Sequence, residues 1–297
     1  MKKVIRVGTR ESELALTQTR WVAEKIKQRF PDIDFEIVGI KTKGDVILDT
    51  RLDKIGGKGL FIKEIENALI NGSIDIAVHS MKDMPAELTD KLTIAAVCKR
   101  EDPRDVLVTT TGSSLEELPQ GSVIGTSSVR REVQILNIRP DLRVKTLRGN
   151  VLTRIDKLRD NEYDAIVLAA AGLKRLGLHE YCSQYLSIEE VIPAVGQGAL
   201  AVEARSGDDI ISFLLESVHC QQTALCVAAE REYLKRLNGG CSVPIAAHAV
   251  IRGNRMKLNG MFASEDRTVI YKACVEGPAD DAASLGQKLA EMIIDQM

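Results

Sequence analysis

The sequence predicts an α/β protein with two hinged lobes of similar design and a third, small α/β domain that contains an antiparallel sheet. Short apolar segments alternate with amphipathic helical segments over most of the chain, which is the pattern of α/β folds. The segment 122–131 repeats the order of the segment 4–13: a strand, a Gly-Thr pair and the start of a helix. Residues 245–275 carry strand-like runs separated by turn signals, which predicts the antiparallel sheet.

The first lobe begins with a buried strand over 4–8 and a helix over 13–29 that Ser12 caps. The expected inner face of this helix carries Leu14, Trp21, Val22 and Ile26. Arg10 lies between the strand and the helix, where the backbone N–H groups of a helix start attract anions. The next strand is expected over 35–40.

The segment 41–61 is a glycine-rich loop that carries Lys54 and Lys58. A loop of this kind is typical of a mobile flap over a ligand site, and it is equally typical of a solvated surface loop. Lys58 is followed by Gly59 and not by the Ser or Thr of a P-loop, which argues against binding of a nucleoside triphosphate.

A helix over 61–70 leads to a strand over 74–78, and the end of this strand delivers Lys82 and Asp83. In open α/β sheets ligands bind beyond the carboxyl ends of the strands, so this pair is a candidate site. The alternative is an ordinary surface ion pair. A further strand is expected over 92–97.

The charged, proline-containing segment 99–105 is expected to be a hinge into the second lobe, whose strands include 122–125, 143–147 and 164–170. Residues 121–180 contain eleven Lys or Arg against seven acids, and eight of the eleven are Arg. Because the Arg fork binds a carboxylate or phosphate through two hydrogen bonds, this excess indicates a small anionic ligand. Five follow predicted strands at one rim of the lobe: Arg130, Arg131, Arg148, Arg154 and Arg175.

The repeated strand–Gly-Thr–helix design predicts a second anion site that faces the first. It would be formed by Ser127, Ser128, Arg130 and Arg131. The segment 193–200, with Gln197, is expected to cross back to the first lobe and add a strand over 200–203. The remainder is expected to form helices over 209–238 with a break near 217–222, strands over 245–252, 257–263 and 268–275, and a helix from about 280.

Cys241 directly follows Gly239 and Gly240, which can take the positive φ values that end a helix. A thiol on such a turn is little shielded and suits covalent attachment of a group. The alternative is a small buried side chain that packs at the helix end, because free cysteines are often buried.

Composition excludes several classes of protein. The net charge of −2 and the 4% of aromatic residues argue against a dedicated nucleic-acid binder. Six cysteines without metal-type spacing predict neither a disulfide framework nor a zinc site, and no metal is expected. Since no signal peptide and no run of 18 apolar residues is present, a cytoplasmic protein with reduced thiols is expected.

The chain resembles the porphobilinogen deaminase family from end to end. The resemblance rests on long motifs in family order: Gly56-Gly57-Lys58-Gly59-Leu60-Phe61, the segment from Asp75 to Pro85, Arg100-Glu101-Asp102-Pro103-Arg104-Asp105, and Gly125 to Arg131. Glu13 and Leu152 depart from the common pattern and touch no proposed role. The family fold is two periplasmic-binding-protein-like lobes plus a third α/β domain. It implies domain 1 at 1–99 and 199–217, domain 2 at 100–198 and domain 3 at 218–297.

The resemblance implies a transferase of tetrapyrrole and heme biosynthesis. Such an enzyme joins four porphobilinogens into hydroxymethylbilane, releases ammonia at each step, and uses a dipyrromethane cofactor held by a thioether at the position of Cys241. Asp83 would be the catalytic carboxylate. Cofactor-binding residues would be Lys82, Ser128, Arg130, Arg131 and Arg154. Substrate-binding residues would be Arg10, Ser12, Arg148, Arg175, Lys54, Lys58 and Gln197. A monomer without nucleic acid or membrane partners is expected.

Two other hypotheses remain from the residues alone. A two-lobed anion-binding module without catalysis explains the Arg rim and the hinge but gives Cys241 and Asp83 no task. A cysteine hydrolase would need a histidine beside Cys241, and the sequence gives no sign that His79 or His248 pairs with it.

Overall fold

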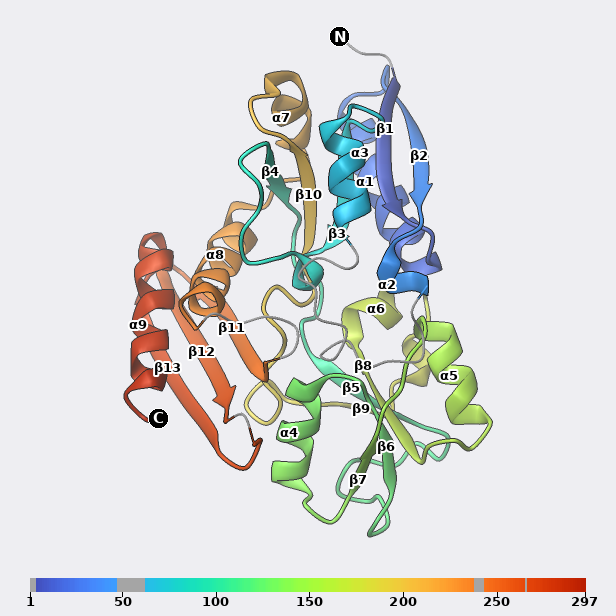
Figure 1. Ribbon diagram of the computed structural model, residues 1–297, viewed down its shortest axis with the longest axis vertical. Helices are drawn as coiled ribbons and strands as arrows, with labels where there is room; N and C mark the ends of the chain where they lie inside the picture. The colour runs from blue at the N-terminus through green and yellow to red at the C-terminus, as the bar shows by residue number, and fades with distance from the viewer. Residues whose placement is uncertain (1–3, 47–61, 238–242, 265) are drawn as a thin grey trace.

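The computed structural model describes residues 4–46, 62–237, 243–264 and 266–297. They form two five-stranded sheets and one three-stranded sheet, with helices packed on them. In Figure 1 the first lobe lies above the second, and the third domain lies to their side. This arrangement confirms the predicted fold class of two α/β lobes and a small third domain with an antiparallel sheet.

The first lobe combines the start of the chain with a strand that returns much later. Its strands are β1 (Val4–Arg10), β2 (Asp34–Ile40), β3 (Ile76–Ser80), β4 (Leu92–Val97) and β10 (Leu200–Arg205). Its helices are α1 (Glu13–Arg29), α2 (Lys43–Val46), α3 (Lys63–Ile70), the 3-10 turn η2 (Met81–Asp83) and α7 (Asp209–Leu215). The strand order is β2-β1-β3-β10-β4, and β10 is antiparallel to both of its neighbours.

The second lobe repeats this topology. Its strands are β5 (Asp105–Thr109), β6 (Val123–Gly125), β7 (Arg143–Lys145), β8 (Ala165–Ala169) and β9 (Gln184–Tyr185). Its helices are α4 (Val129–Ile138), α5 (Val151–Arg159), α6 (Ala170–Arg175) and the 3-10 turn η3 (His179–Tyr181). The order is β7-β6-β8-β5-β9, with β5 antiparallel to β8 and β9. In each lobe the antiparallel strand is the one that arrives from the other lobe.

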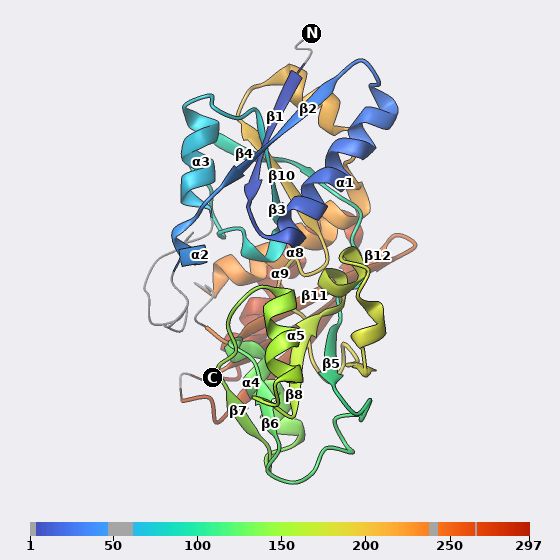
Figure 2. The same cartoon turned by 90° about the vertical axis from the view of Figure 1, so that its right-hand side faces the viewer.

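The third domain packs two helices on a three-stranded antiparallel sheet. Its elements are α8 (Gln221–Arg236), β11 (Ile245–Arg252), β12 (Arg255–Ala263), β13 (Ile270–Pro278), the 3-10 turn η4 (Ala279–Asp281) and α9 (Ala282–Ile294). Gly253 turns the β11–β12 hairpin with a φ of 62°, as its sequence predicted. In Figure 2 the lobes lie one above the other, and α8 lies at the level where they meet.

Most expected elements are present with shifted ends, and some expectations were wrong. The break in the 209–238 stretch is confirmed, because α7 ends at Leu215 and α8 begins at Gln221. The strands β5 and β9 were not predicted; β9 has only two residues, and β5 begins inside the segment expected to be a hinge. Trp21 is 39% exposed and does not lie on the inner face of α1.

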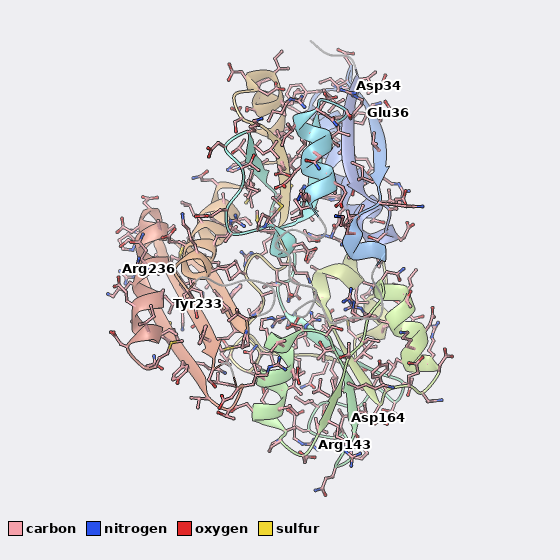
Figure 3. The ribbon with its side chains drawn as sticks, in the orientation of Figure 1. Asp34, Glu36, Arg143, Asp164, Tyr233 and Arg236 are labelled. Carbon is pink, nitrogen blue, oxygen red and sulfur yellow. The ribbon has the colours of Figure 1, made fainter. Side chains whose placement is uncertain are left out.

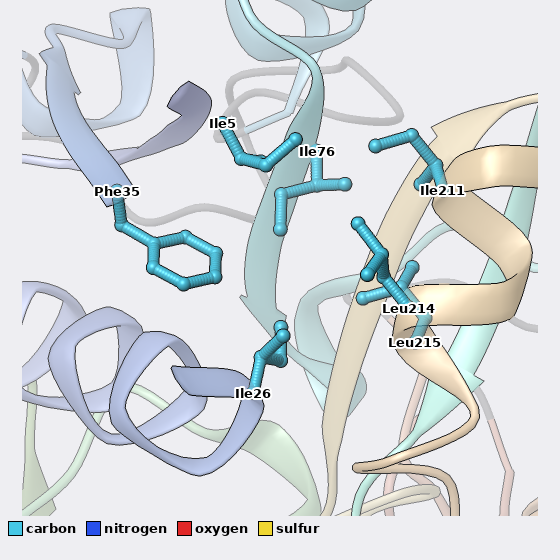
Figure 4. A pocket seen from close by; sticks show the side chains of 7 residues that line it. All are labelled: Ile5, Ile26, Phe35, Ile76, Ile211, Leu214 and Leu215. Carbon is cyan, nitrogen blue, oxygen red and sulfur yellow. The ribbon is translucent and has the colours of Figure 1, made fainter. Parts of the chain in front are cut away.

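The core of the first lobe contains a small apolar pocket between the sheet, α1 and α7 (Figure 4). Its lining residues are Ile5, Ile26, Phe35, Ile76, Ile211, Leu214 and Leu215. None of these side chains can donate a hydrogen bond or balance a charge. This pocket therefore does not suit the anionic ligand that the sequence predicts, and the candidate site lies where the lobes meet.

Candidate active site

The carboxyl end of β3 presents Lys82 and Asp83 on a short turn. The backbone N–H of Met81 donates to the carbonyl of Ala199 at 3.0 Å, which ties the turn to the start of β10. Met81 and Met84 are buried beneath the turn, whereas Lys82 and Asp83 are half-buried. The apolar anchors on either side thus hold the two charged residues at the edge of the first lobe.

Asp105 gathers the cations of the second lobe at the start of β5. Arg131 donates to its Oδ1 from Nη2 at 2.7 Å and from Nε at 3.1 Å, and Arg130 Nη1 lies 2.8 Å from its Oδ2. Gln197 donates to the same Oδ1 from Nε2 at 2.9 Å. Burial acts to raise the pKa of Asp105, but the two guanidinium groups outweigh it and hold this pKa well below its usual range. One buried carboxylate therefore faces two buried cations.

Lys82 connects the two lobes electrostatically. Its pKa is lowered to about 8, first by burial and then by the nearby charge of Arg131, while Asp83 and Asp105 act in the opposite direction. Lys82 and Asp83 belong to the first lobe, and Arg131 and Asp105 belong to the second. Charges of the two lobes therefore lie close enough to influence each other. The second anion site that faces the first stays a prediction.

Arg154 and Arg148 extend this positive region. The pKa of Arg154 is lowered to about 10 by burial and by the charges of Arg131 and Arg148, and Asp83 partly offsets the effect. Burial also lowers the pKa of Arg148. Arg154 Nε donates to the carbonyl of Gly149 at 2.8 Å, so the guanidinium is held over the loop that follows β7. Cations held this close together without enough acids attract an anion.

The other predicted residues have more varied surroundings. Arg175 at the end of α6 donates to the carbonyl of Gly198 at 2.7 Å and so binds the return crossing. Ser12 caps α1 by accepting from the N–H of Ala15 at 3.4 Å. Ser128 is the N-cap residue of α4, but its side chain makes no capping bond. Arg10 is half-buried at the end of β1.

Three predicted residues lie outside the described residues: Cys241, Lys54 and Lys58. Part of the Arg excess in the second lobe also lies away from the rim. Figure 3 shows Arg143 and Asp164 near the end of this lobe that is distant from the first lobe, and Arg143 is exposed. Arg139 is bound to Asp141 and to the carbonyl of Leu115, so its role is structural.

Two protein-family models match most of the chain. Residues 5–212 match the model described as "Porphobilinogen deaminase, dipyromethane cofactor binding domain", and residues 224–295 match "Porphobilinogen deaminase, C-terminal domain". The chain belongs to the porphobilinogen deaminase family. This membership confirms the predicted hydroxymethylbilane synthase activity in tetrapyrrole biosynthesis and the predicted dipyrromethane cofactor.

Curated relatives support this assignment. The chain is 51% identical over 292 residues to the porphobilinogen deaminase of Brevibacillus brevis, covering 98% of this chain and 94% of that one. It is 50% identical over 298 residues to the one of Shouchella clausii, covering 100% and 95%. Among solved structures it is similar to the periplasmic VFT2 domain of BvgS from Bordetella pertussis, at 14% identity, TM-score 0.43, and coverage of 77% and 92%.

Lys82 of the first lobe and the Arg residues at the rim of the second form one rim between the lobes, and the residues of this rim fit a dipyrromethane. Each pyrrole unit of this cofactor carries an acetate and a propionate, so the group is a polyanion. The lowered pKa values of Lys82 and Arg154 show cations that are partly desolvated and that repel neighbouring cations, a cost that bound carboxylates would relieve. Arg130 Nε is buried and has no hydrogen-bond partner among the described residues. The donor set of the rim therefore matches an acidic ligand.

The sequence did not reveal a second buried carboxylate, Glu230 on α8. It accepts from Arg100 Nη1 at 2.8 Å, from the N–H of Gly196 at 2.7 Å and from the N–H of Ala249 at 2.8 Å. Arg100 lies on the outgoing crossing, Gly196 on the return crossing and Ala249 on β11. Glu230 thus connects both crossings to the third domain. In the sequence, the one sign of this role was an acidic residue next to Ala229 on a helix face.

Two negative findings apply to the described ranges. No helix there is long and apolar enough to span a membrane. No group of three or more His, Cys, Asp or Glu side chains in the same ranges is arranged to hold a metal ion.

Proposed function

We propose that porphobilinogen units are joined at the rim between the lobes and that Asp83 is the catalytic carboxylate. The observation that supports this is the position of Asp83: it belongs to the first lobe, and its charge influences both Lys82 beside it and Arg154 of the second lobe. A carboxylate in this place would lie among the groups that hold an acidic substrate, close to the positive charge that develops in the reaction.

The cations around Asp83 would hold the carboxylates of the ligands. We assign the cofactor to Lys82, Ser128, Arg130, Arg131 and Arg154, and the substrate to Arg10, Ser12, Arg148, Arg175, Lys54, Lys58 and Gln197. The contacts of Asp105 refine these roles. Arg131 and Gln197 already donate hydrogen bonds to Asp105. They would therefore act on a bound anion through N–H groups that are not used in these bonds and, for Arg131, through its positive charge. Each charge-assisted hydrogen bond would contribute about 1.5 to 3 kcal/mol.

Asp83 would act on charge and on protons. When ammonia leaves the aminomethyl group of porphobilinogen, positive charge develops on the substrate, and a fixed carboxylate stabilises it. The same carboxylate would accept a proton from a pyrrole unit. When bound, the dipyrromethane would supply the free pyrrole carbon to which the first substrate unit is added, and that carbon would lose its proton. After four additions, each with loss of one ammonia, water would cleave the bond between the cofactor and the new chain and release the linear tetrapyrrole.

Several broader features belong to the same proposal. Cys241 would hold the cofactor through a thioether. Domain 1 would comprise 1–99 and 199–217, domain 2 would comprise 100–198 and domain 3 would comprise 218–297, a division that the three sheets support. We further propose a cytoplasmic monomer that needs no metal, nucleic acid or membrane for activity.

The test is a comparison of Asp83→Asn with the wild type and with Cys241→Ser. Intact mass should show two added pyrrole units in the wild type and none in Cys241→Ser. The turnover of Asp83→Asn should fall by ~100- to 1000-fold, because one preorganised charge is lost from the transition state, while its unfolding midpoint stays near that of the wild type. Near-normal turnover in Asp83→Asn would remove Asp83 from the catalytic role, and an unmodified wild type would remove Cys241 as the anchor.

A further inference from the structure

Helix α8 runs beside the segment that carries the proposed catalytic residue. Three α8 residues spaced one helical turn apart face successive parts of this segment: Val227, Arg231 and Lys235. Val227 is 2% exposed and belongs to the same buried cluster as Met81 and Met84, which flank Lys82 and Asp83. These three α8 residues and the segment 81–87 form a seam. Its first contact is apolar packing directly beneath the turn.

Arg231 forms the second contact, with backbone and not with an acid. Its Nη2 donates to the carbonyl of Pro85 at 2.7 Å and to the carbonyl of Ala86 at 3.0 Å. Burial lowers the pKa of Arg231, so the cation is partly desolvated while it binds these two carbonyls. One nitrogen that bridges consecutive carbonyls restrains the backbone immediately after Asp83 and Met84.

Lys235 forms the third contact, and it provides a comparison. Its Nζ lies 3.0 Å from Oε1 of Glu87, but both side chains are more than half exposed, at 55% and 71%. Exposed ion pairs of this kind contribute little because solvent screens them. Within one seam, Arg231 is thus the partly buried contact and Lys235 the solvated one.

We propose that Arg231 is a positioning residue for the condensation reaction, which fixes the turn with Asp83 relative to the helix that leads to Cys241. The inference rests on the proposed roles of Asp83 and Cys241. Helix α8 ends at Arg236, and Cys241 follows it in the chain. These contacts therefore join the segment of the proposed catalytic carboxylate to the helix that precedes the proposed cofactor anchor in the chain, although the two lie far apart in sequence.

The chemical reason is the tolerance of the reaction. Joining two pyrrole units requires the anchored chain, the substrate and the carboxylate in one geometry, and a shift of about 1 Å can cost on the order of 100-fold in rate. The first-lobe sheet and the third domain meet along α8. Without the Arg231 contacts, the interactions of 84–87 with α8 among the described residues would be the apolar packing of Met84 and the solvated Lys235 pair.

The experiment compares Arg231→Met, Arg231→Lys and the control Lys235→Met in the full chain carrying its cofactor. Intact mass reports loading with the cofactor. Hydrogen exchange of a peptide covering 81–88, measured beside a peptide from β1, reports the restraint of the turn. Steady-state turnover of porphobilinogen, calculated per loaded molecule, gives kcat and KM.

We expect Arg231→Met to lower kcat by about 10- to 100-fold with little change in KM, because Arg231 positions the turn and touches no substrate. Exchange should accelerate in 81–88 and not in the β1 peptide. Arg231→Lys should recover part of both effects, since the ammonium can reach one carbonyl. Lys235→Met should stay within about twofold of the wild type.

Two results would overturn the inference: an unchanged kcat in loaded Arg231→Met, or acceleration of exchange in all peptides alike, which would indicate a general loss of stability. If Arg231→Met does not fold, Arg231→Lys decides by the same criteria. The exchange data concern the restraint alone. Loss of the mass increment in the wild type, or full turnover in Asp83→Asn, would instead refute the proposed function, so the two failures are distinguishable.

Discussion

Asp105 and Glu230 are two fully buried carboxylates that connect different parts of the molecule, and they differ in the number of cations around them. Asp105 meets two guanidinium groups, those of Arg130 and Arg131, and the amide of Gln197. Glu230 meets one guanidinium, that of Arg100, and two backbone N–H groups. The Asp105 cluster thus has a surplus of positive charge, whereas the charges of the Glu230 cluster are balanced.

The difference separates a binding site from a joint. Buried charge without a partner is costly, so a balanced cluster is what a structural connection requires. A surplus of buried cations is tolerated where an anion arrives to offset it, and the rim continues this surplus through Lys82, Arg148 and Arg154. Charge balance, rather than burial or the number of contacts, therefore distinguishes the two regions.

Glu230→Ala should produce the largest loss of stability. It leaves Arg100 as a buried cation without its carboxylate and removes the acceptor of two buried N–H groups. Breaking a buried ion pair in this way costs about 3 to 5 kcal/mol of unfolding free energy. Chemical denaturation measures the loss, and turnover of the folded fraction should stay within a few fold of the wild type because no rim residue changes.

Glu230→Gln serves as the milder partner of this variant. It keeps the shape and one acceptor oxygen but loses the charge, so its stability should lie between those of the wild type and Glu230→Ala. Equal stability of all three proteins would mean that the cluster is not a joint. A selective loss of substrate binding without loss of stability would assign Glu230 to the site instead.

Asp105→Asn should produce a smaller loss that depends on the cofactor. In the Cys241→Ser background, which would lack the cofactor, removing the carboxylate that pairs with Arg130 and Arg131 should cost about 3 kcal/mol. In the loaded chain the loss should be smaller, because the carboxylates of the cofactor offset the freed charge and stabilise the folded state. Denaturation of the four proteins in parallel measures this coupling.

The effect of pH gives a second view of Asp105. Because its folded pKa is depressed, its contribution to stability is full above the unfolded value of an aspartate, about 3.9, and is lost as the pH falls below it. Asp105→Asn should therefore flatten the acid limb of the stability curve. An identical loss in loaded and unloaded chains would contradict the view that the Asp105 cluster belongs to the binding site.

Parallel strands deliver the residues that follow them to one edge of a sheet, so the order of elements in the sequence is enough to propose which charged residues gather there. Lys82 and Asp83 follow β3 at the edge of the first sheet, and Arg148 follows β7 at the edge of the second. The partners of the two buried acids could not be predicted. Asp105 stands in a run of charges that resembles a solvated hinge, and only the unpredicted pairing of β5 with β8 buries it.

Glu230 was missed for a related reason. Its partners Arg100 and Gly196 are distant in sequence and come together only when both crossings pass α8. The exposed Trp21 shows the converse, since an apolar side chain at helical spacing need not be buried. Periodicity therefore predicts elements and edges, whereas long-range pairing of charges depends on the tertiary fold.

The smallest expected effect is the loss of the positive charge of Lys82 at high pH, measured as a change in Kd. It tests whether the surplus of positive charge extends into the first lobe. With a pKa lowered to about 8, the ammonium is charged below that pH and becomes neutral as the pH rises through it, well before an ordinary lysine does. A charged donor binds a carboxylate more strongly than a neutral one by about 1 kcal/mol, or roughly fivefold in Kd. In Cys241→Ser the cofactor site would be empty, so porphobilinogen, which carries the same acetate and propionate, serves as the probe for it. Titration calorimetry should therefore show a Kd that rises by about that factor between pH 7 and pH 9.

Lys82→Arg in the same background provides the control for this effect, because a guanidinium stays charged throughout the range. The rise in Kd should disappear in this variant, while the affinity at pH 7 stays comparable. A rise that persists in Lys82→Arg would assign the pH dependence to another group and would confine the surplus to the second lobe. The difference in charge balance between the rim and the Glu230 joint would then belong to the second lobe alone and not to the place where the two lobes meet.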